Sequence, residues 1–186
     1  MDLFEITNFI TNSAESLNIK KWDFGASFSN DFSVQVDKGI AKQLKASQKQ
    51  VLTLRVWNKK NLVGITTTSD LSENGLKKAL YQANLASDYG NKNELTDFSP
   101  LAKDPIKKIK ETKRYPSGIK KLLETLRIAE NKLLNKHSAI KTIPYNGLSE
   151  SFFKRIYANS EGAQRSYEKS QAAIYLYARA EENNRK

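Results

Sequence analysis

The sequence contains no cysteine, one histidine, four prolines and eight glycines in 186 residues. Without cysteine the chain can form neither a disulfide nor a thiolate metal site, which fits a reducing compartment. No apolar run approaches the roughly 18 residues of a membrane-spanning helix. The start, Met1–Glu5, is acidic and amphipathic, unlike the basic and then apolar opening of a secretory signal. These absences predict a cytoplasmic protein without a membrane segment.

The scarcity of histidine argues against a catalytic zinc site, unless carboxylates supplied nearly all of the ligands, and against a Ser/His/Asp triad. His137 is the only histidine, whereas a catalytic zinc ion takes about three protein ligands and keeps an open position. A Ser/His/Asp triad would also need His137, and no serine lies in a G-x-S-x-G stretch. Glu181 and Glu182 are adjacent, so on a strand they would face opposite sides. We predict no catalytic or metal-ligating residue, and a surface or helix-capping role for His137.

Positive charge, in contrast, is abundant: the formal net charge is +11. Such a charge suggests a nucleic-acid partner. However, lysines outnumber arginines 24 to 7 and are spread over every segment, while base and phosphate recognition favours the forked guanidinium group of arginine. The densest basic run, Lys103–Arg114, is interrupted by a proline and acidic residues and is interpreted as a charged linker. We expect a solvated, lysine-rich surface and disfavour nucleic acid as a partner.

The periodicity of apolar residues predicts an α+β fold, with amphipathic helices packed on an antiparallel sheet. A helix is predicted for residues 2–17, with Asp2 and Glu5 forming a capping box. Two hairpins follow: Phe24 to Val36 with a turn at residues 29–31, and Leu52 to Thr68 with a turn at residues 58–61. A second helix starts after Ser72, and its predicted buried face is Leu76, Ala79, Leu80, Ala83 and Ala86.

The second part of the chain repeats this pattern after a long connection. Periodicity fades between residues 88 and 116, which are predicted to be a linker containing the basic run. A third helix is predicted for residues 117–136, followed by strands at 141–145, 152–159 and 170–180. The predicted organisation is therefore a helix and strand unit at 1–87, a linker at 88–116, and a second helix and strand unit at 117–186.

The two units resemble each other in sequence. Phe28–Gly39 and Leu148–Gly162 share an apolar start, a predicted turn and a strand that closes on glycine. Ser47–Val56 and Ser170–Arg179 both begin with Ser-Gln and then alternate. We predict a helix-plus-hairpins repeat whose second copy is incomplete, although independent patterning of the same elements is the alternative. The missing arm would leave a strand edge unpaired, which folded proteins avoid, so we expect the chain to be the N-terminal portion of a longer protein.

Several segments together resemble the TldD/PmbA family, whose members were once described as modulators of DNA gyrase. They are a helix, a strand leading into VDKG, the stretch VLTLRVWNKKNLVGITTTSDLS, an A-x-x-x-A helix at Ala79 and Ala83, a second helix after a linker, and YANSEG. The resemblance covers essentially the whole chain. TTSDLS and NSEG are its most specific parts, and both are closer to the PmbA (TldE) branch.

The resemblance implies a cytoplasmic two-subunit peptidase whose chains enclose a chamber that admits unfolded peptide. It also implies a zinc site built from a His-Glu-x-x-x-His helix in the C-terminal half of the TldD-type subunit. This segment has no such motif, so no cofactor is expected in it. The implied partners are a TldD-type subunit or a second copy of the chain, together with an unfolded peptide substrate.

The expected role of the chain is therefore that of a non-catalytic domain forming chamber wall and subunit interface. Extended peptides can bind by adding a strand to a sheet edge, so the closing strand and the NSEG turn supply the candidate peptide-contacting or interface residues: Asn159, Ser160, Glu161, Gly162, Tyr175 and Tyr177. The alternative is that these residues only complete the sheet. Trp22, Trp57 and the two tyrosines could stack bases, but their alternation with apolar residues favours sheet packing.

Two other functions remain open from the sequence. The first is a basic module that contacts DNA or DNA gyrase, supported by the net charge and by the older description of the family. The second is a purely structural dimerisation domain, which is compatible with the peptidase hypothesis.

Overall fold

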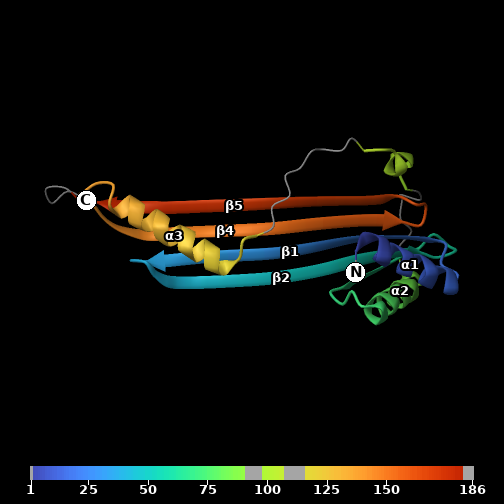
Figure 1. Cartoon of the computed structure of the whole chain (residues 1–186). Helices are drawn as coiled ribbons and strands as arrows, with labels where there is room; N and C mark the ends of the chain where they lie inside the picture. Colours follow the sequence, from blue (N-terminus) through green and yellow to red (C-terminus); the bar gives the residue numbers. More distant parts are fainter. Residues whose placement is uncertain (1, 91–97, 107–115, 182–186) are drawn as a thin grey trace. The chain divides into compact units, whose positions relative to one another are not determined.

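The computed structural model describes residues 2–90, 98–106 and 116–181. Within these ranges the chain forms the α-helices α1 (Leu3–Ser16), α2 (Glu73–Ser87) and α3 (Ile119–Leu134), and a short 3-10 helix, η1 (Pro100–Lys103). The strands are β1 (Lys21–Asp37), β2 (Ile40–Trp57), β3 (Val63–Thr68), β4 (Ile140–Asn159) and β5 (Gln164–Ala180). They form one sheet in the order β3-β2-β1-β4-β5 (Figure 1). The predicted α+β class is confirmed.

The chain divides into two compact units, and four of the strands contribute residues to both. Unit 1 consists of residues 1–28, 49–111 and 154–168, and unit 2 of residues 29–48, 112–153 and 169–186. Each unit thus combines segments from both halves of the sequence. The predicted domain boundaries at residues 87 and 116 divide the chain into consecutive segments, whereas each compact unit combines separate segments. The predicted boundaries stay a prediction.

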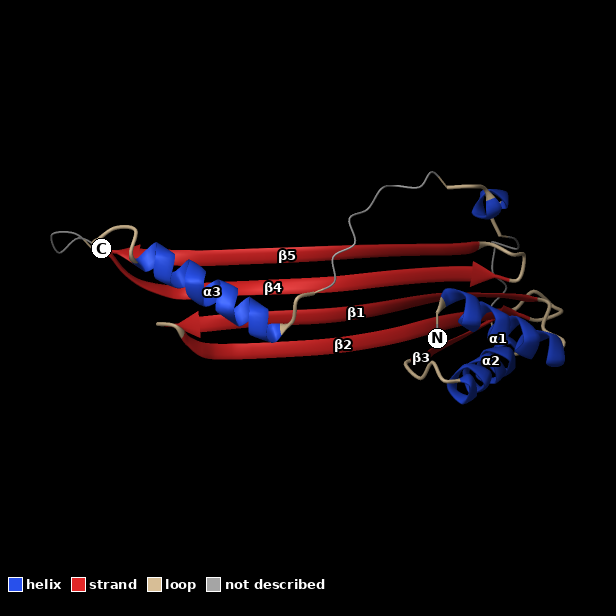
Figure 2. Cartoon of the chain, in the orientation of Figure 1, coloured by secondary structure: helices blue, strands red, loops and turns tan. Residues whose placement is uncertain are grey.

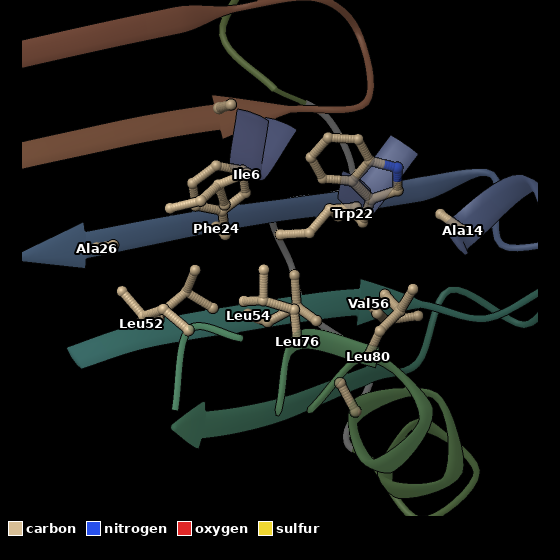
Figure 3. Close-up of a cluster of buried hydrophobic side chains, with 14 of the residues drawn as sticks. Ile6, Ala14, Trp22, Phe24, Ala26, Leu52, Leu54, Val56, Leu76 and Leu80 are labelled. Carbon is tan, nitrogen blue, oxygen red and sulfur yellow. The ribbon is translucent and has the colours of Figure 1, made fainter. Parts of the chain in front are cut away.

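The core of unit 1 lies between the sheet and the helices α1 and α2 (Figure 3). Apolar residues at every second position of β1 and β2 face this core, as do residues at helical spacing on α1 and α2. The fully buried members include Ile6, Ile10, Phe24, Leu52, Leu54, Val56, Leu76, Leu80 and Ala83. The buried face predicted for the second helix is confirmed, except that Ala86 is exposed.

Both helices of unit 1 begin at the predicted caps. The main-chain N–H of Glu5 donates to Asp2 Oδ1 at 2.9 Å, and that of Asp2 donates to Glu5 Oε2 at 2.7 Å. In α2, the N–H of Gly75 donates to Ser72 Oγ at 3.1 Å. A glycine in the first turn of a helix lowers helix propensity. Here it is required, because a Cβ on Gly75 would lie 2.4 Å from the carbonyl oxygen of Asp70.

The predicted hairpin between β2 and β3 is also confirmed. The strands are antiparallel, with Leu52 opposite Thr68 and Trp57 opposite Val63. The turn between them is held by the Asn58 side chain, whose Oδ1 accepts from the N–H groups of Lys60 and Leu62 at 2.9 and 3.1 Å. Asn61 takes the positive φ of 58° that this turn requires.

Two predicted strand regions are correct in type, but the breaks predicted within them are wrong. There is no turn at residues 29–31, because β1 runs without interruption from Lys21 to Asp37. The turn lies instead at Lys38 and Gly39, whose φ angles of 49° and 76° are those of a tight hairpin turn. Likewise, the strands predicted at 141–145 and 152–159 are parts of the single strand β4. Because the hairpin predicted within residues 24–36 is absent, the predicted helix-plus-hairpins repeat is not confirmed.

Unit 2 has a smaller core, formed where α3 covers one face of its part of the sheet (Figure 2). Leu122 and Leu126 of α3 pack against Val34 and Val36 of β1, with Leu148 and Leu176 beside them. Strand β5 has a neighbour on one side only, since it is the last strand in the sheet order of the described residues. None of the described helices is long and apolar enough to cross a membrane.

Two buried polar side chains fix the geometry of unit 2. The Glu130 carboxylate of α3 accepts from the N–H groups of Lys38 and Gly39 at 3.2 and 2.6 Å, and so ties the helix to the turn between β1 and β2. Asn146 of β4 accepts from the N–H of Val36 at 2.9 Å and donates to its carbonyl at 2.8 Å. The Asn146 amide therefore supplies β1 with the two hydrogen bonds that a neighbouring main chain would otherwise provide.

Candidate functional site

The face of the unit 1 sheet that is turned away from the core is polar and aromatic. Strand alternation places the neighbours of the core residues on this second face. Its members come from β1, β2 and β4 and are Lys21, Asp23, Thr53, Arg55, Trp57, Tyr157 and Asn159. We call this set the polar face of unit 1.

A buried carboxylate lies at the centre of the polar face. Asp23 is 2% exposed, and its two oxygens accept from Nε and Nη2 of Arg55, the first at 2.8 Å. The hydroxyl of Tyr157 donates to Asp23 Oδ2 at 3.3 Å, and Asn159 Nδ2 donates to that hydroxyl at 3.4 Å. The chain of contacts Arg55–Asp23–Tyr157–Asn159 therefore links three strands.

This network keeps its groups in definite charge states. The hydrogen bond with Asp23 raises the pKa of the Arg55 guanidinium, so Arg55 is charged at any physiological pH. Burial, followed by the nearby Asp23 carboxylate, raises the pKa of the Tyr157 phenol, which therefore stays protonated. Because neither Arg55 nor Tyr157 would exchange a proton near neutral pH, these two residues are suited to holding strands together and not to acid–base catalysis.

An aromatic and cationic cluster adjoins the network at the end of β2. The rings of Trp57 and Phe98 meet edge to face, with centroids 5.4 Å apart. The Lys21 ammonium lies 5.6 Å from the centroid of the Trp57 ring and 5.3 Å from that of Phe98. The Arg55 guanidinium carbon lies 5.2 Å from the Trp57 ring, within the range of a cation–π contact.

The predicted site residues Asn159–Gly162 form the turn between β4 and β5 in unit 1. Asn159 is buried, and its Oδ1 accepts from the N–H groups of Glu161 and Ala163 at 3.1 and 3.0 Å. Ser160 joins the turn to β1: its N–H donates to the carbonyl of Trp22 at 2.9 Å, and its Oγ accepts from the N–H of Trp22 at 3.2 Å. Gly162 has a φ of 88°. The NSEG pattern is thus a turn whose side chains serve its own main chain and that of β1.

The other two predicted site residues, Tyr175 and Tyr177, lie on β5 in unit 2. Their rings are in edge contact, with centroids 6.0 Å apart. The Tyr175 hydroxyl accepts from Gln35 Nε2 at 3.2 Å, and its ring lies so close to Gly147 that a Cβ there would come within 2.6 Å of it. Both side chains are exposed, Tyr177 by 64%. They belong to a different unit from Asn159–Gly162 and are therefore a separate candidate site.

The residues present do not fit a zinc site. Among the described residues there is no group of three or more His, Cys, Asp or Glu that could hold a metal ion. His137 is exposed, and its Nδ1 accepts from the N–H of Ala139 at 3.1 Å in the loop between α3 and β4. It therefore stabilises a loop, in agreement with the surface role predicted for it, while the helix itself ends at Asn135.

Sequence reasoning misses the Asp23–Arg55–Tyr157 network and the contact of Phe98 with Trp57. A signal is present for the first, because WDFG and TLRVW each carry a single charge inside an alternating apolar strand. Two opposite charges on neighbouring strands at matching alternation indicate a cross-strand pair. No such signal exists for Phe98, which lies in a segment without periodicity.

Comparison with known proteins gives a match to one family. Residues 101–186 match the model of the PmbA/TldA metallopeptidase central domain. No curated protein matches the chain. Among solved structures, TldE from Thermococcus kodakarensis is similar with a TM-score of 0.75 and 16% identity, over 98% of this chain and 40% of that one. A proposed modulator of a DNA gyrase from Thermotoga maritima has a TM-score of 0.70 and 14% identity, over 98% of this chain and 41% of that one.

A proposed modulator of DNA gyrase from Bacteroides thetaiotaomicron is similar with a TM-score of 0.70 and 12% identity, over 91% of this chain and 39% of that one. The chain thus spans about two fifths of the length of the solved structures that it matches. At these identities the structures show a common fold. The family model covers α3, β4 and β5, including the NSEG turn that carries part of the sequence resemblance. The chain is therefore similar to the TldD/PmbA family in residues 101–186, and it shares its fold with the solved structures named above.

Proposed function

We propose that the chain is a non-catalytic domain of a TldD/PmbA-type metallopeptidase subunit that acts on unfolded or precursor peptides in the cytoplasm. It forms part of the chamber wall and of the subunit interface, while zinc is held by the C-terminal half of a TldD-type subunit. The observation that carries this proposal is the match of residues 101–186 to a metallopeptidase central domain. The single histidine and the lack of cysteine support a role without chemistry of its own.

The outer edge of β5 is the best candidate for contact with an extended peptide. Residues 171–178, QAAIYLYA, carry no charge and no proline, and they lie at the end of the described sheet order. Natural proteins protect exposed edges with charges, especially lysine. The edge of β2 in unit 2 has this protection in Lys42 and Lys45. Within the described residues this edge lacks such protection, and an unprotected edge can accept an extended segment, either a peptide or a following strand of the same subunit, through main-chain hydrogen bonds.

The proposal is tested by a peptidase assay on the full-length subunit together with its TldD-type partner. An unfolded peptide is incubated with the pair, with and without a metal chelator. We expect cleavage that the chelator abolishes and that added zinc restores. Cleavage that is insensitive to chelator, or no cleavage by the assembled pair, would contradict the peptidase role.

The second candidate is a basic module that contacts DNA or DNA gyrase. It is favoured by the net charge of +11 and by the similarity to two proposed gyrase modulators. A filter-binding titration of the protein with DNA separates this candidate from the peptidase-domain candidate. Phosphate contacts give an affinity that falls steeply with salt, so binding that is undetectable at about 0.15 M salt would remove this candidate.

A further inference from the structure

Trp57 is buried by a segment that is itself weakly held. Trp57 is 7% exposed, although it lies on the polar face of unit 1 and not in the core. Its described cover includes Phe98, whose ring meets it edge to face. Phe98 begins the described segment Phe98–Ile106, in which η1 has no buried residue and Leu101 is 73% exposed. Part of the Trp57 surface is therefore covered by a ring from a segment with little burial of its own.

The polar contacts that hold this segment are few and exposed. Lys103 Nζ lies 3.4 Å from Glu161 Oε2, and about half of each side chain is accessible to solvent. Arg165 Nη2 donates to the carbonyl of Asp104 at 2.7 Å, also at the surface. Exposed ion pairs contribute little to stability. The segment can therefore leave Trp57 without breaking any buried hydrogen bond that the described residues show.

The surroundings of Trp57 are those of a binding site for an aromatic side chain. Lys21 lies near both rings and Arg55 near the indole ring, so one cation lies beside the position that Phe98 occupies and a second lies beside the indole. In addition, Trp57 Nε1 is buried and has no hydrogen-bond acceptor among the described residues. A buried donor without an acceptor is unfavourable. A ligand that brought a carbonyl group with its aromatic ring would supply the missing acceptor.

We propose that Trp57, Lys21 and Arg55 form an exchangeable binding site for an aromatic side chain of an extended peptide, and that Phe98 occupies it as an internal substitute. A peptide with a phenylalanine displaces Phe98 and places its own ring on Trp57, with a main-chain carbonyl available to the indole N–H. The site selects peptides by one aromatic residue, unlike strand addition, which ignores sequence. The natural ligand follows from the proposed peptide-handling role, but the site itself is tested without any peptidase.

The test measures binding of two labelled peptides to the 186-residue chain by fluorescence anisotropy. The peptides are Gly-Ser-Gly-Phe-Gly-Ser-Gly and the same sequence with alanine in place of phenylalanine. Where Phe98 fills the site about nine-tenths of the time, its removal strengthens binding about tenfold. We expect Phe98→Ala to bind the phenylalanine peptide about tenfold more tightly than the wild type and to leave the alanine peptide unchanged. The matched control Leu101→Ala removes an exposed side chain from the same segment and leaves both affinities unchanged.

A second measurement follows Trp57 itself. Acrylamide quenching of tryptophan fluorescence rises in Phe98→Ala, because Trp57 becomes accessible, and falls again when the phenylalanine peptide is added. Phe98→Leu keeps an apolar cover and gives an intermediate affinity. Equal gains for both peptides, no gain in Phe98→Ala, or a gain of the same size in Leu101→Ala would overturn the inference. Any of these results leaves the chelator assay untouched, so the failure of this site and the failure of the peptidase role are distinguishable.

Discussion

At the scale of single residues, the polar face of unit 1 shows how a charge can be placed inside a small sheet. Asp23 lies between Trp22 and Phe24, both in the core cluster, yet its own side chain belongs to the opposite face. There it meets Arg55 and Tyr157. A buried carboxylate is tolerated only when it is paired and hydrogen-bonded, so the three residues form one structural group.

Removing the cation from this group should destabilise unit 1. Arg55→Leu leaves the 2% exposed Asp23 carboxylate with a tyrosine hydroxyl as its remaining described donor. Breaking a fully buried pair costs about 3–5 kcal/mol, but the Arg55 side chain is 40% exposed, so solvent screening reduces the expected loss to about 2 kcal/mol. Urea unfolding measures this loss as a decrease in the free energy of unfolding. The control is Arg127→Leu, a change of an exposed residue on α3, which should shift the free energy of unfolding by less than about 0.5 kcal/mol. Equal losses of stability in the two variants would contradict the view that Asp23, Arg55 and Tyr157 form one structural group.

Gly75 gives a second prediction, in which packing opposes helix propensity. Alanine in the first turn of α2 would be favoured by about 1 kcal/mol on propensity alone. Its Cβ, however, would lie 2.4 Å from both the carbonyl oxygen and the Cγ of Asp70, and overpacking of this kind costs about 1–3 kcal/mol. We expect Gly75→Ala to lower the thermal midpoint of unfolding. Gly25→Ala, where a Cβ would meet no atom within 4 Å, should leave the midpoint nearly unchanged.

At the scale of elements, the sequence predicts helices better than long strands. Both capped helices of unit 1 begin where Asp2 and Ser72 indicate, because a cap is a local hydrogen-bond pattern. The false turn at residues 29–31 has the polar composition of a turn but no residue with positive φ. A polar stretch can form either a turn or a half-exposed strand. The neighbouring strands that decide between a turn and a strand are distant in sequence. The Asp23–Arg55 pair leaves a signal in the two single charges of WDFG and TLRVW, but the pairing of their strands, which are distant in sequence, is what identifies it.

The tie between α3 and the hairpin turn is testable at this scale. Glu130 is 3% exposed and its carboxylate accepts from two main-chain N–H groups. Hydrogen bonds to a charged group contribute about 1.5–3 kcal/mol each, and an N–H left without an acceptor adds to the loss. Glu130→Ala should therefore destabilise unit 2 by about 2–3 kcal/mol, measured by urea unfolding. Glu124→Ala, on the exposed side of the same helix, should change stability by less than about 0.5 kcal/mol.

At the scale of the whole molecule, the sequence predicts the family better than the site. Several segments together resemble the TldD/PmbA family, with TTSDLS and NSEG as the most specific parts, and the match of residues 101–186 agrees with the resemblance. The candidate site is less predictable. The sequence suggests Asn159 and Ser160 as peptide contacts, whereas the structure shows their side chains occupied by the turn and by Trp22. A turn that must hold two strands and a turn that binds a ligand have the same composition, so sequence alone does not separate them.

The edge of β5 provides the prediction that bears on the proposed peptidase assembly. If an extended peptide pairs with residues 171–178, a lysine on this edge should disfavour pairing, as lysines do on natural edges. Ile174→Lys is the test, since Ile174 is 51% exposed and the change leaves no cavity. Leu44→Lys, at 50% exposure on the part of β2 that lies outside the described pairing with β3, is the matched control for charge and surface. In the full-length subunit with its partner, we expect Ile174→Lys to raise KM for an unfolded peptide at least about fivefold, a difference of about 1 kcal/mol. Leu44→Lys leaves KM unchanged. Equal KM values in the two variants would show that the peptide does not pair with β5, even where the assembly cleaves it.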